Sequence, residues 1–570
     1  MYPTIEEEIV MAHRVAHILR EFERRKTDYG EGAGSMKLDL LRQLDGRSFG
    51  RASDLLRLHE ILCFVRAYPD NEELLAQAER ALERFSERND LRRFRKALRN
   101  TGVAGTSIHF SFFASTAYWL ARRWPSRLTI DWDEFEQTER LERLLSLLAL
   151  PAESPGLDEY GFEVREWIDR MKGPNETDAA FLLRRLHQIR MSDAHIQMLY
   201  EDMDVPICLA PGPTTPARTR EKLPVPAIKY QTVPFRRSLP GARKSTDRTP
   251  PAIRALSVRE GRAVVDLAKS TMVTRERDLD AFAYGDSRDV RMVDCGDGLQ
   301  FAYIGVIPQR RLILECLYGF IMLKNGVAVG YGTNTGLFGS SEVAFTVFDT
   351  FRAGEAALMY HGMLSIARHL FAADTFTVDP YQLGEDNEDA IQSGAWWFYH
   401  KLGFRPRDSR LIDIMRRELK RKQANPGHRS SPTTLRKLAT ASVFLHLENR
   451  RADVLGVLPL ADVGLKITQY LATRFGHDRR LATSTCSREA ARLLGVGSLR
   501  RFSTGERTAW QHWSPLIMIL PGIRRWSRKD KTALVRTVRA KGGLRESEYL
   551  VGFDGHTRLR QAIQTLARSD

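Results

Sequence analysis

The chain has 570 residues, of which 43% are hydrophobic and 28% are charged, a composition typical of soluble globular proteins. This length exceeds what one hydrophobic core accommodates, so we expect about three or four domains. No stretch supplies the roughly 18 uninterrupted apolar residues of a membrane span. The N-terminal sequence MYPTIEEEIV lacks the basic and apolar regions of a signal peptide. We therefore expect a cytoplasmic protein without a membrane span.

The net charge of +16 is unevenly distributed along the chain. Residues 401–570 contain 35 Lys and Arg against 14 Asp and Glu, so this part carries +21 and residues 1–400 carry −5. Such a region indicates either a surface for nucleic acid or another polyanion, or a solvated arginine-rich surface, and the sequence favours neither. The five cysteines are scattered and form no C-x-x-C pair, so we expect neither a disulfide framework nor a metal site.

Residues 1–205 have helical spacing almost throughout. Ser53 precedes apolar residues spaced three and four apart up to residue 67, and residues 72–85 form a second amphipathic pattern after a turn. This predicts an all-helical N-terminal domain. Residues 206–251 then contain ten of the 24 prolines, with Arg and Lys between them. We predict a Pro-rich basic linker over residues 206–254.

Residues 255–420 have the pattern of an α+β domain. A helix is expected from Ser257, followed by strands over residues 300–306 and 312–317. Two apolar runs flank Asn325-Gly326, which predicts a β-hairpin because both residues accept a positive φ. A strand at 342–348, a helix from about residue 353, a strand at 375–378 and a helix at 387–401 follow. The prediction is a central mixed β-sheet with flanking helices.

The turn between the strand at 342–348 and the next helix reads FRAGEA, residues 351–356. Gly354 lets the backbone approach a ligand closely. The helix that follows directs its free N–H groups and its positive dipole end toward the turn. We expect this turn to hold an anion.

Two motifs in this domain resemble those of the GNAT-type N-acetyltransferase superfamily. The first is the family's N…AI…FYxKLGF signature, which is matched by Asn387, Ala390, Ile391, Trp397, Phe398, Tyr399, Lys401, Leu402, Gly403 and Phe404. The second is the family's acyl-coenzyme A pyrophosphate loop, [QR]-x-x-G-x-[GA], in which Gly354 and Ala356 occupy the last two positions and Phe351 replaces Gln or Arg. The resemblance covers about residues 255–415.

The resemblance implies a GNAT-like fold and an acyl-CoA-dependent N-acyltransferase, with acetyl-CoA or another acyl-CoA as co-substrate and an unknown amine as acceptor. It implies that backbone N–H groups near residues 347–349 polarise the thioester carbonyl, and that Tyr399 protonates the leaving thiolate. The residues expected to contact the coenzyme are Val347, Phe348, Asp349, Arg352, Ala353, Gly354, Glu355, Ala356 and Asn387.

A base for the acceptor amine is sought among carboxylates at strand positions that face the acceptor cleft. Glu342 enters the strand at 342–348, and Glu315 enters the hairpin. Both residues meet the condition, and both are equally compatible with an ordinary surface position. We rank Glu342 first.

The C-terminal part departs from the family's pattern. The family normally has two closing strands after Phe404, but residues 411–420 have helical spacing, so the usual end of the fold is missing or displaced. Residues 430–570 predict a basic helical domain, with its clearest helices at 434–447, 461–475, 487–494 and 531–539. Phe351 and the missing strands favour an alternative function, a catalytically silent GNAT-like scaffold that binds RNA or another polyanion through the basic C-terminal third.

Overall fold

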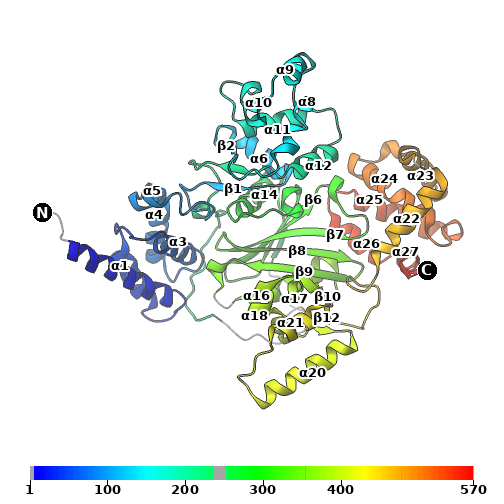
Figure 1. The fold of residues 1–570 in the computed structure, drawn as a ribbon. Helices are drawn as coiled ribbons and strands as arrows, with labels where there is room; N and C mark the ends of the chain where they lie inside the picture. The colour runs from blue at the N-terminus through cyan, green and yellow to red at the C-terminus, as the bar shows by residue number, and fades with distance from the viewer. Residues whose placement is uncertain (1–4, 236–251, 353–354, 477, 569–570) are drawn as a thin grey trace.

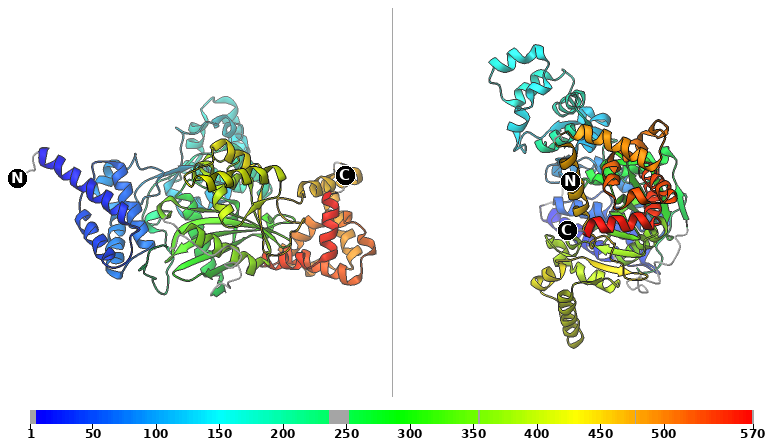
Figure 2. Two further views of the ribbon diagram at one scale, coloured as in Figure 1. Left: turned by 90° about the horizontal axis from the view of Figure 1, so that it is seen from below. Right: turned by 90° about the vertical axis from the view of Figure 1, so that its right-hand side faces the viewer.

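The structure, a computed structural model, describes residues 5–235, 252–352, 355–476 and 478–568. It is a mixed α/β protein in which a central sheet lies between helical units from the two ends of the chain (Figures 1 and 2). The sheet has nine strands in the order β11-β12-β10-β9-β8-β7-β6-β5-β4. Its strands are β4 (Ala252–Ala255), β5 (Gly285–Asp294), β6 (Leu299–Val306), β7 (Cys316–Lys324), β8 (Val327–Leu337), β9 (Ser340–Val347), β10 (Thr375–Val378), β11 (Arg405–Pro406) and β12 (Val443–His446).

The first helical unit packs around apolar faces with the spacing expected from the sequence. Its helices are α1 (Ile5–Arg25), α2 (Ala33–Leu44), α3 (Ala52–Ala67), α4 (Glu72–Glu83) and α5 (Asn89–Phe94). Asn71 caps α4 by accepting a hydrogen bond from the Leu74 N–H. Leu55, Ile61 and Leu62 on α3 are completely buried. The predicted helices at 53–67 and 72–85 are thus confirmed as α3 and α4.

A second N-terminal unit contains strands, so the prediction of an all-helical domain was wrong. A three-stranded antiparallel sheet, β1 (Ile108–Phe110), β3 (Ile207–Leu209) and β2 (Leu128–Ile130), forms within it. Strands of three residues are too short to show an alternating pattern in the sequence, so these strands were not predicted. The helices of this unit are α6 (Ala114–Arg123), α7 (Thr138–Glu142), α8 (Leu145–Leu148), α9 (Ser154–Glu159), α10 (Val164–Met171), α11 (Asp178–Gln188) and α12 (Asp193–Met203).

The described part of the predicted linker is packed against the rest of the molecule. Its first residues form β3, and its last described residues form β4 at the edge of the central sheet. Between them, Thr219 is buried, and its carbonyl accepts a hydrogen bond from Arg66 at 2.6 Å. Residues 206–235 are therefore an ordered connection rather than a free linker, because their backbone groups are bound by buried side chains.

The central sheet begins as an antiparallel series from β4 to β9. The predicted hairpin is confirmed: β7 and β8 join at Asn325 and Gly326, whose φ angles are 50° and 80°. On one face of the sheet, Phe282 of α15 packs against Tyr331, and on the other face Phe371 of α16 packs against Tyr318. The helices here are α14 (Val258–Val273), α15 (Asp280–Ala283), α16 (Ala356–Phe371), α17 (Pro380–Leu383), α18 (Glu388–Ser393) and α19 (Ala395–Lys401).

Two strands that follow Phe404 complete the sheet, and an insertion separates them in the sequence. β11 comes directly after Phe404, whereas β12 comes only after α20 (Ser409–Ala424) and α21 (Pro432–Ala439). β12 lies between β10 and β11 and is antiparallel to both. The predicted helix at 434–447 was therefore wrong beyond Ala439. The central sheet also extends past residue 420, where we had placed the end of its domain.

The C-terminal unit is helical, as predicted. Its helices are α22 (Leu460–Phe475), α23 (Arg479–Leu494), α24 (Thr504–Ile519), α25 (Arg528–Lys541), α26 (Glu546–Asp554) and α27 (Thr557–Arg568). Trp510 and Trp513 are completely buried, and Trp526 is 5% exposed. These tryptophans anchor the core of the unit, so they are not available to stack on bases of a nucleic acid.

Candidate functional site

Strand β9 extends beyond the end of its parallel neighbour β10. Their register pairs Ser340 with Thr375 and ends at the pair Glu342 and Thr377. Beyond this pair β9 continues to Val347, and within the described residues its partner there is β8 alone. β10 itself ends one residue later, at Val378, where it is paired with β12. A gap is therefore left in the sheet beside β9 after Glu342, and this edge of β9 has no ladder in the described part of the chain.

The register gathers three carboxylates on one face of the sheet. Leu317, Thr335 and Glu342 lie side by side across β7, β8 and β9. Glu315 is two residues before Leu317, and Asp379 is two residues after Thr377, so alternation places both on the same face as Glu342. Both predicted base candidates are thus brought to one face.

The pKa of Glu342 is raised well above its ordinary value. Burial, and then the negative charges of Asp379 and Glu315, raise the pKa of Glu342 to about 7. A carboxyl group with such a pKa exchanges its proton near neutral pH, which suits a general base. Glu315, by contrast, has its backbone carbonyl bound by Lys541 at 2.5 Å, which ties its segment to the C-terminal unit.

Aromatic rings fill the other face of the sheet beside the gap. Phe345, on the unpaired part of β9, lies 5.1 Å from Tyr360 of α16 and 6.2 Å from Phe398 of α19, measured between ring centroids. Tyr399 packs 5.5 Å from Tyr360 and 6.0 Å from Phe404. Glu342 and Tyr399 therefore lie on opposite faces of the sheet, and the gap between β9 and β10 lies between them.

The two tyrosines of this cluster are buried and hold their protons at neutral pH. Burial raises the pKa of Tyr399, whose side chain is 3% exposed. Burial, followed by the charges of Tyr399 and Glu342, raises the pKa of Tyr360 well above its ordinary value. The Tyr360 hydroxyl is buried and has no hydrogen-bond partner among the described residues. A phenol in this state is a proton donor.

The turn after β9 begins with a short 3₁₀ helix, η6 (Asp349–Phe351). Val347 ends β9, and its carbonyl accepts a hydrogen bond from the Arg352 Nε at 3.1 Å. The guanidinium group of Arg275 lies 3.8 Å from the centroid of the Phe348 ring. Asp349 and Arg352 are exposed and form an ion pair at 2.8 Å. Ala353 and Gly354, which were predicted to contact the coenzyme, lie outside the described residues.

Helix α3 of the first helical unit covers this turn. Thr350 is 7% exposed and donates a hydrogen bond to the Glu60 carboxylate. The same carboxylate accepts a hydrogen bond from Arg218 at 2.5 Å, and Arg218 also donates to the Thr350 hydroxyl at 2.9 Å. Phe351 borders a cavity of about 10 Å³ beside Arg66 and Arg218. The turn is thus bound to the N-terminal half of the chain on one side.

A carboxylate of the protein itself, that of Glu355, lies at the start of α16. Glu355 is the N-cap residue of α16 and is 8% exposed, and Ala356 is the first residue of the helix. The Lys324 Nζ lies 3.8 Å from the Glu355 carboxylate, and burial lowers the pKa of this lysine. The positive end of the helix dipole therefore already faces one carboxylate. Any bound anion would have to share this site with Glu355.

Asn387, the first residue of the predicted signature, has a clear structural role. Its side-chain oxygen accepts a hydrogen bond from the Ala390 N–H at 3.1 Å, and its amide donates to the Tyr381 carbonyl at 3.1 Å. The residue thus caps α18. The predicted helix at 387–401 is divided into α18 and α19 at Gly394, which has a φ of 67°.

Sequence reasoning missed Tyr360 and Asp379. Tyr360 lies within the helix predicted from about residue 353, and its buried hydroxyl without a partner among the described residues is visible only in three dimensions. Asp379 follows the strand at 375–378 directly, so its place at the end of a strand was a usable signal. Its carboxylate also accepts a hydrogen bond from the Tyr381 N–H at 2.9 Å.

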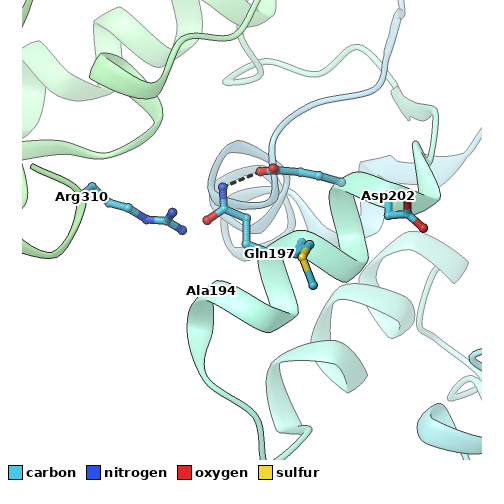
Figure 3. Close-up of a pocket in the computed structure, with 6 residues that line it drawn as sticks. Ala194, Gln197, Asp202 and Arg310 are labelled. Carbon is cyan, nitrogen blue, oxygen red and sulfur yellow. Dashed lines mark hydrogen bonds between the residues drawn. The ribbon is translucent and has the colours of Figure 1, made fainter. Parts of the chain in front are cut away.

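A surface groove lies apart from this cluster, between α12 and the loop before β7 (Figure 3). Its volume is about 400 Å³, and Gln197 of α12 faces Arg310 across it. Met198 and Glu201 of α12 also line the groove. Gln197 donates a hydrogen bond to Glu201 at 2.6 Å. The groove holds none of the predicted site residues.

No protein-family model matches the chain, and neither the curated proteins nor the solved structures that were compared with it gave a match. Within the described ranges, no helix is long and apolar enough to cross a membrane.

Proposed function

We propose that the protein is an acyl-CoA-dependent N-acyltransferase with a GNAT-like central domain, acting on an amine acceptor. The observation that carries the proposal is the edge of β9 beyond Glu342, which has no ladder among the described residues because β10 ends after Thr377 and Val378. A strand that extends past its neighbour leaves backbone N–H and C=O groups on that edge free for an extended ligand. A further support is the pair of closing strands β11 and β12, which follow Phe404 as the resemblance requires.

The chemistry assigns a role to each group at the gap. Acyl transfer needs an amine that loses a proton, a thioester carbonyl that is polarised and a thiolate that gains a proton. In this proposal Glu342 accepts the amine proton, free N–H groups of β9 polarise the carbonyl, and Tyr399 protonates the departing thiolate. The two side chains act from opposite faces of the sheet.

One observation favours the alternative, a catalytically silent scaffold. Glu355 places a buried carboxylate at the start of α16, where the pyrophosphate of a coenzyme would have to bind. Like charges at one site repel, which disfavours the anion. In this reading the basic C-terminal third binds RNA or another polyanion.

Release of free thiol from acetyl-CoA, in the presence of a panel of primary amines, tests the proposal. We expect amine-dependent thiol release by the wild-type protein, together with a coenzyme A adduct in native mass spectrometry. A protein that binds no coenzyme A at concentrations up to the millimolar range would instead support the scaffold.

A further inference from the structure

A basic insertion separates the last two strands of the central sheet. Residues 407–442 connect β11 to β12 and contain ten Lys and Arg against three Asp and Glu, so they carry +7. This segment supplies a third of the +21 carried by residues 401–570. Its longest element, α20, projects from the body of the molecule in both figures that show the whole chain (Figures 1 and 2).

The two faces of α20 differ in composition. Leu411, Met415 and Glu418 are buried against the body. The opposite face is exposed and basic, and it carries Arg410, Arg417, Lys420 and Arg421. These positions share one face because they are separated by three, four and seven residues. We call this set the α20 basic face.

A polar network holds α20 in a fixed position. The buried carboxylate of Glu418 accepts hydrogen bonds from Ser430 at 2.6 Å and from Arg421 at 2.8 Å. Ser430 in turn accepts a hydrogen bond from the indole of Trp397 on α19 at 3.0 Å. The ammonium group of Lys422 lies 3.3 Å from the centroid of a Trp397 ring. These contacts hold the projecting helix α20 in a defined position relative to α19.

Two of the four residues of the α20 basic face are unpaired in the described part of the chain, and the other two remain largely exposed. Arg417 and Lys420 have no ion pair among the described residues. Arg410 pairs with Asp408 at 3.4 Å, but its side chain remains 88% exposed. Arg421 pairs with the buried Glu418 at 2.8 Å, and its side chain is 64% exposed. One exposed carboxylate, Asp413, also lies on this side, and it pairs with Arg416 at 3.6 Å. The outward side of the helix therefore keeps a net positive charge.

We propose that the α20 basic face docks the phosphate backbone of a nucleic acid. From Arg410 to Arg421 the helix rises by about 16 Å, a distance over which duplex DNA carries on the order of ten phosphates. The apolar residues of α20 face the protein body. A helix that binds a membrane surface must instead insert an apolar face into the lipid. The charge pattern therefore fits nucleic acid better than a bilayer.

Fluorescence anisotropy with a short labelled RNA and a duplex DNA tests this proposal on the full chain. The test variant replaces Arg410, Arg417 and Lys420 with Gln, and leaves the Glu418 network intact. The matched control replaces Arg492, Arg500 and Arg501 of the C-terminal unit with Gln, which removes the same charge from residues that are also exposed. Circular dichroism verifies that both variants fold.

We expect the test variant to bind about tenfold or more weakly at low salt. The slope of its plot of log affinity against log salt should be shallower by about 2 to 3, because each lost phosphate contact removes about 0.7 to 0.9 from the slope. The control should bind like the wild type. Equal binding by the two variants, absence of binding by the wild type at low salt, or binding to phosphatidylserine vesicles but not to nucleic acid would overturn the proposal. The measurement uses neither coenzyme A nor an acceptor, so its outcome is independent of the proposed catalysis.

Discussion

Glu342 on β9 lies directly opposite Thr377 on β10, and this is the last register pair of the two parallel strands. The carboxylate with a pKa of about 7 therefore stands at the point where the sheet opens. Tyr360 and Tyr399 lie on the other face beside the same gap. A proton acceptor and two proton donors thus flank one opening.

Replacement of Tyr399 by Phe should separate catalysis from packing. The ring is retained and the proton is lost, so turnover should fall by roughly 10²-fold or more, the usual scale for a lost general acid. Coenzyme A affinity and melting temperature should change little. The matched control is Tyr360→Phe, which removes a buried hydroxyl without a partner and should raise the melting temperature. A lowered melting temperature with unchanged turnover in Tyr399→Phe would make Tyr399 a packing residue.

Glu342 should make both activity and stability depend on pH. Its folded-state pKa of about 7 is above the ordinary value of 4.5, so the folded protein prefers the protonated form. The stability that this preference provides is complete below about pH 4.5 and is lost as pH rises through about 7, with a limit of about 3 kcal/mol. Glu342→Gln should therefore unfold at a higher temperature than the wild type at pH 8.5, but not at pH 4.5.

Enzymatic activity that depends on Glu342 should rise with pH, whereas the stability that Glu342 provides falls with pH. As a base the residue works when it is deprotonated, so kcat/KM for thiol release should rise through about pH 7. This rise should be absent in Glu342→Gln, whose residual rate should be lower by roughly 10²-fold or more. An unchanged pH profile in the variant would exclude Glu342 as the base.

Glu60 should control how firmly the turn after β9 is held. Burial alone would raise its pKa, but His59 and Arg218 outweigh burial and lower the pKa to about 2. This contribution to stability is present above about pH 4.5 and is lost as pH falls toward 2. Glu60→Ala leaves Arg218 without its carboxylate and should cost about 3–5 kcal/mol. The control, Thr350→Val, removes the two hydrogen bonds of the Thr350 hydroxyl, to Glu60 and from Arg218, but leaves the Glu60–Arg218 ion pair, and should cost about 2 kcal/mol. Equal losses in thermal melts would contradict this account.

The sequence predicted the elements whose signals are local. The turn at Asn325-Gly326 requires a positive φ, and that requirement is visible in two residues. The start of α14 was likewise predicted from Ser257, and the structure shows Ser257 as its N-cap. The same holds for the strand at 375–378, which is short, buried and flanked by breaks.

Elements defined by distant partners were not predictable. β12 has four residues and continues the spacing of α21, and its identity as a strand depends on pairing with β10, more than 60 residues earlier. β5 is rich in Asp and Arg, and it pairs because β4 and β6 flank it. For the site, the position of Glu342 on its strand was predictable. Its nearness to Asp379 and Glu315, which determines its pKa, required the register of four strands.

Hydrogen–deuterium exchange with and without coenzyme A tests the central claim most directly, because it needs no knowledge of the acceptor. If the coenzyme binds along the free edge of β9, amides in residues 343–352 should exchange more slowly at saturating ligand, by about tenfold or more in the strand. Peptides from α22 to α27 should show no change. Unchanged exchange in residues 343–352, or protection confined to the C-terminal unit, would contradict the proposed acyl-CoA site.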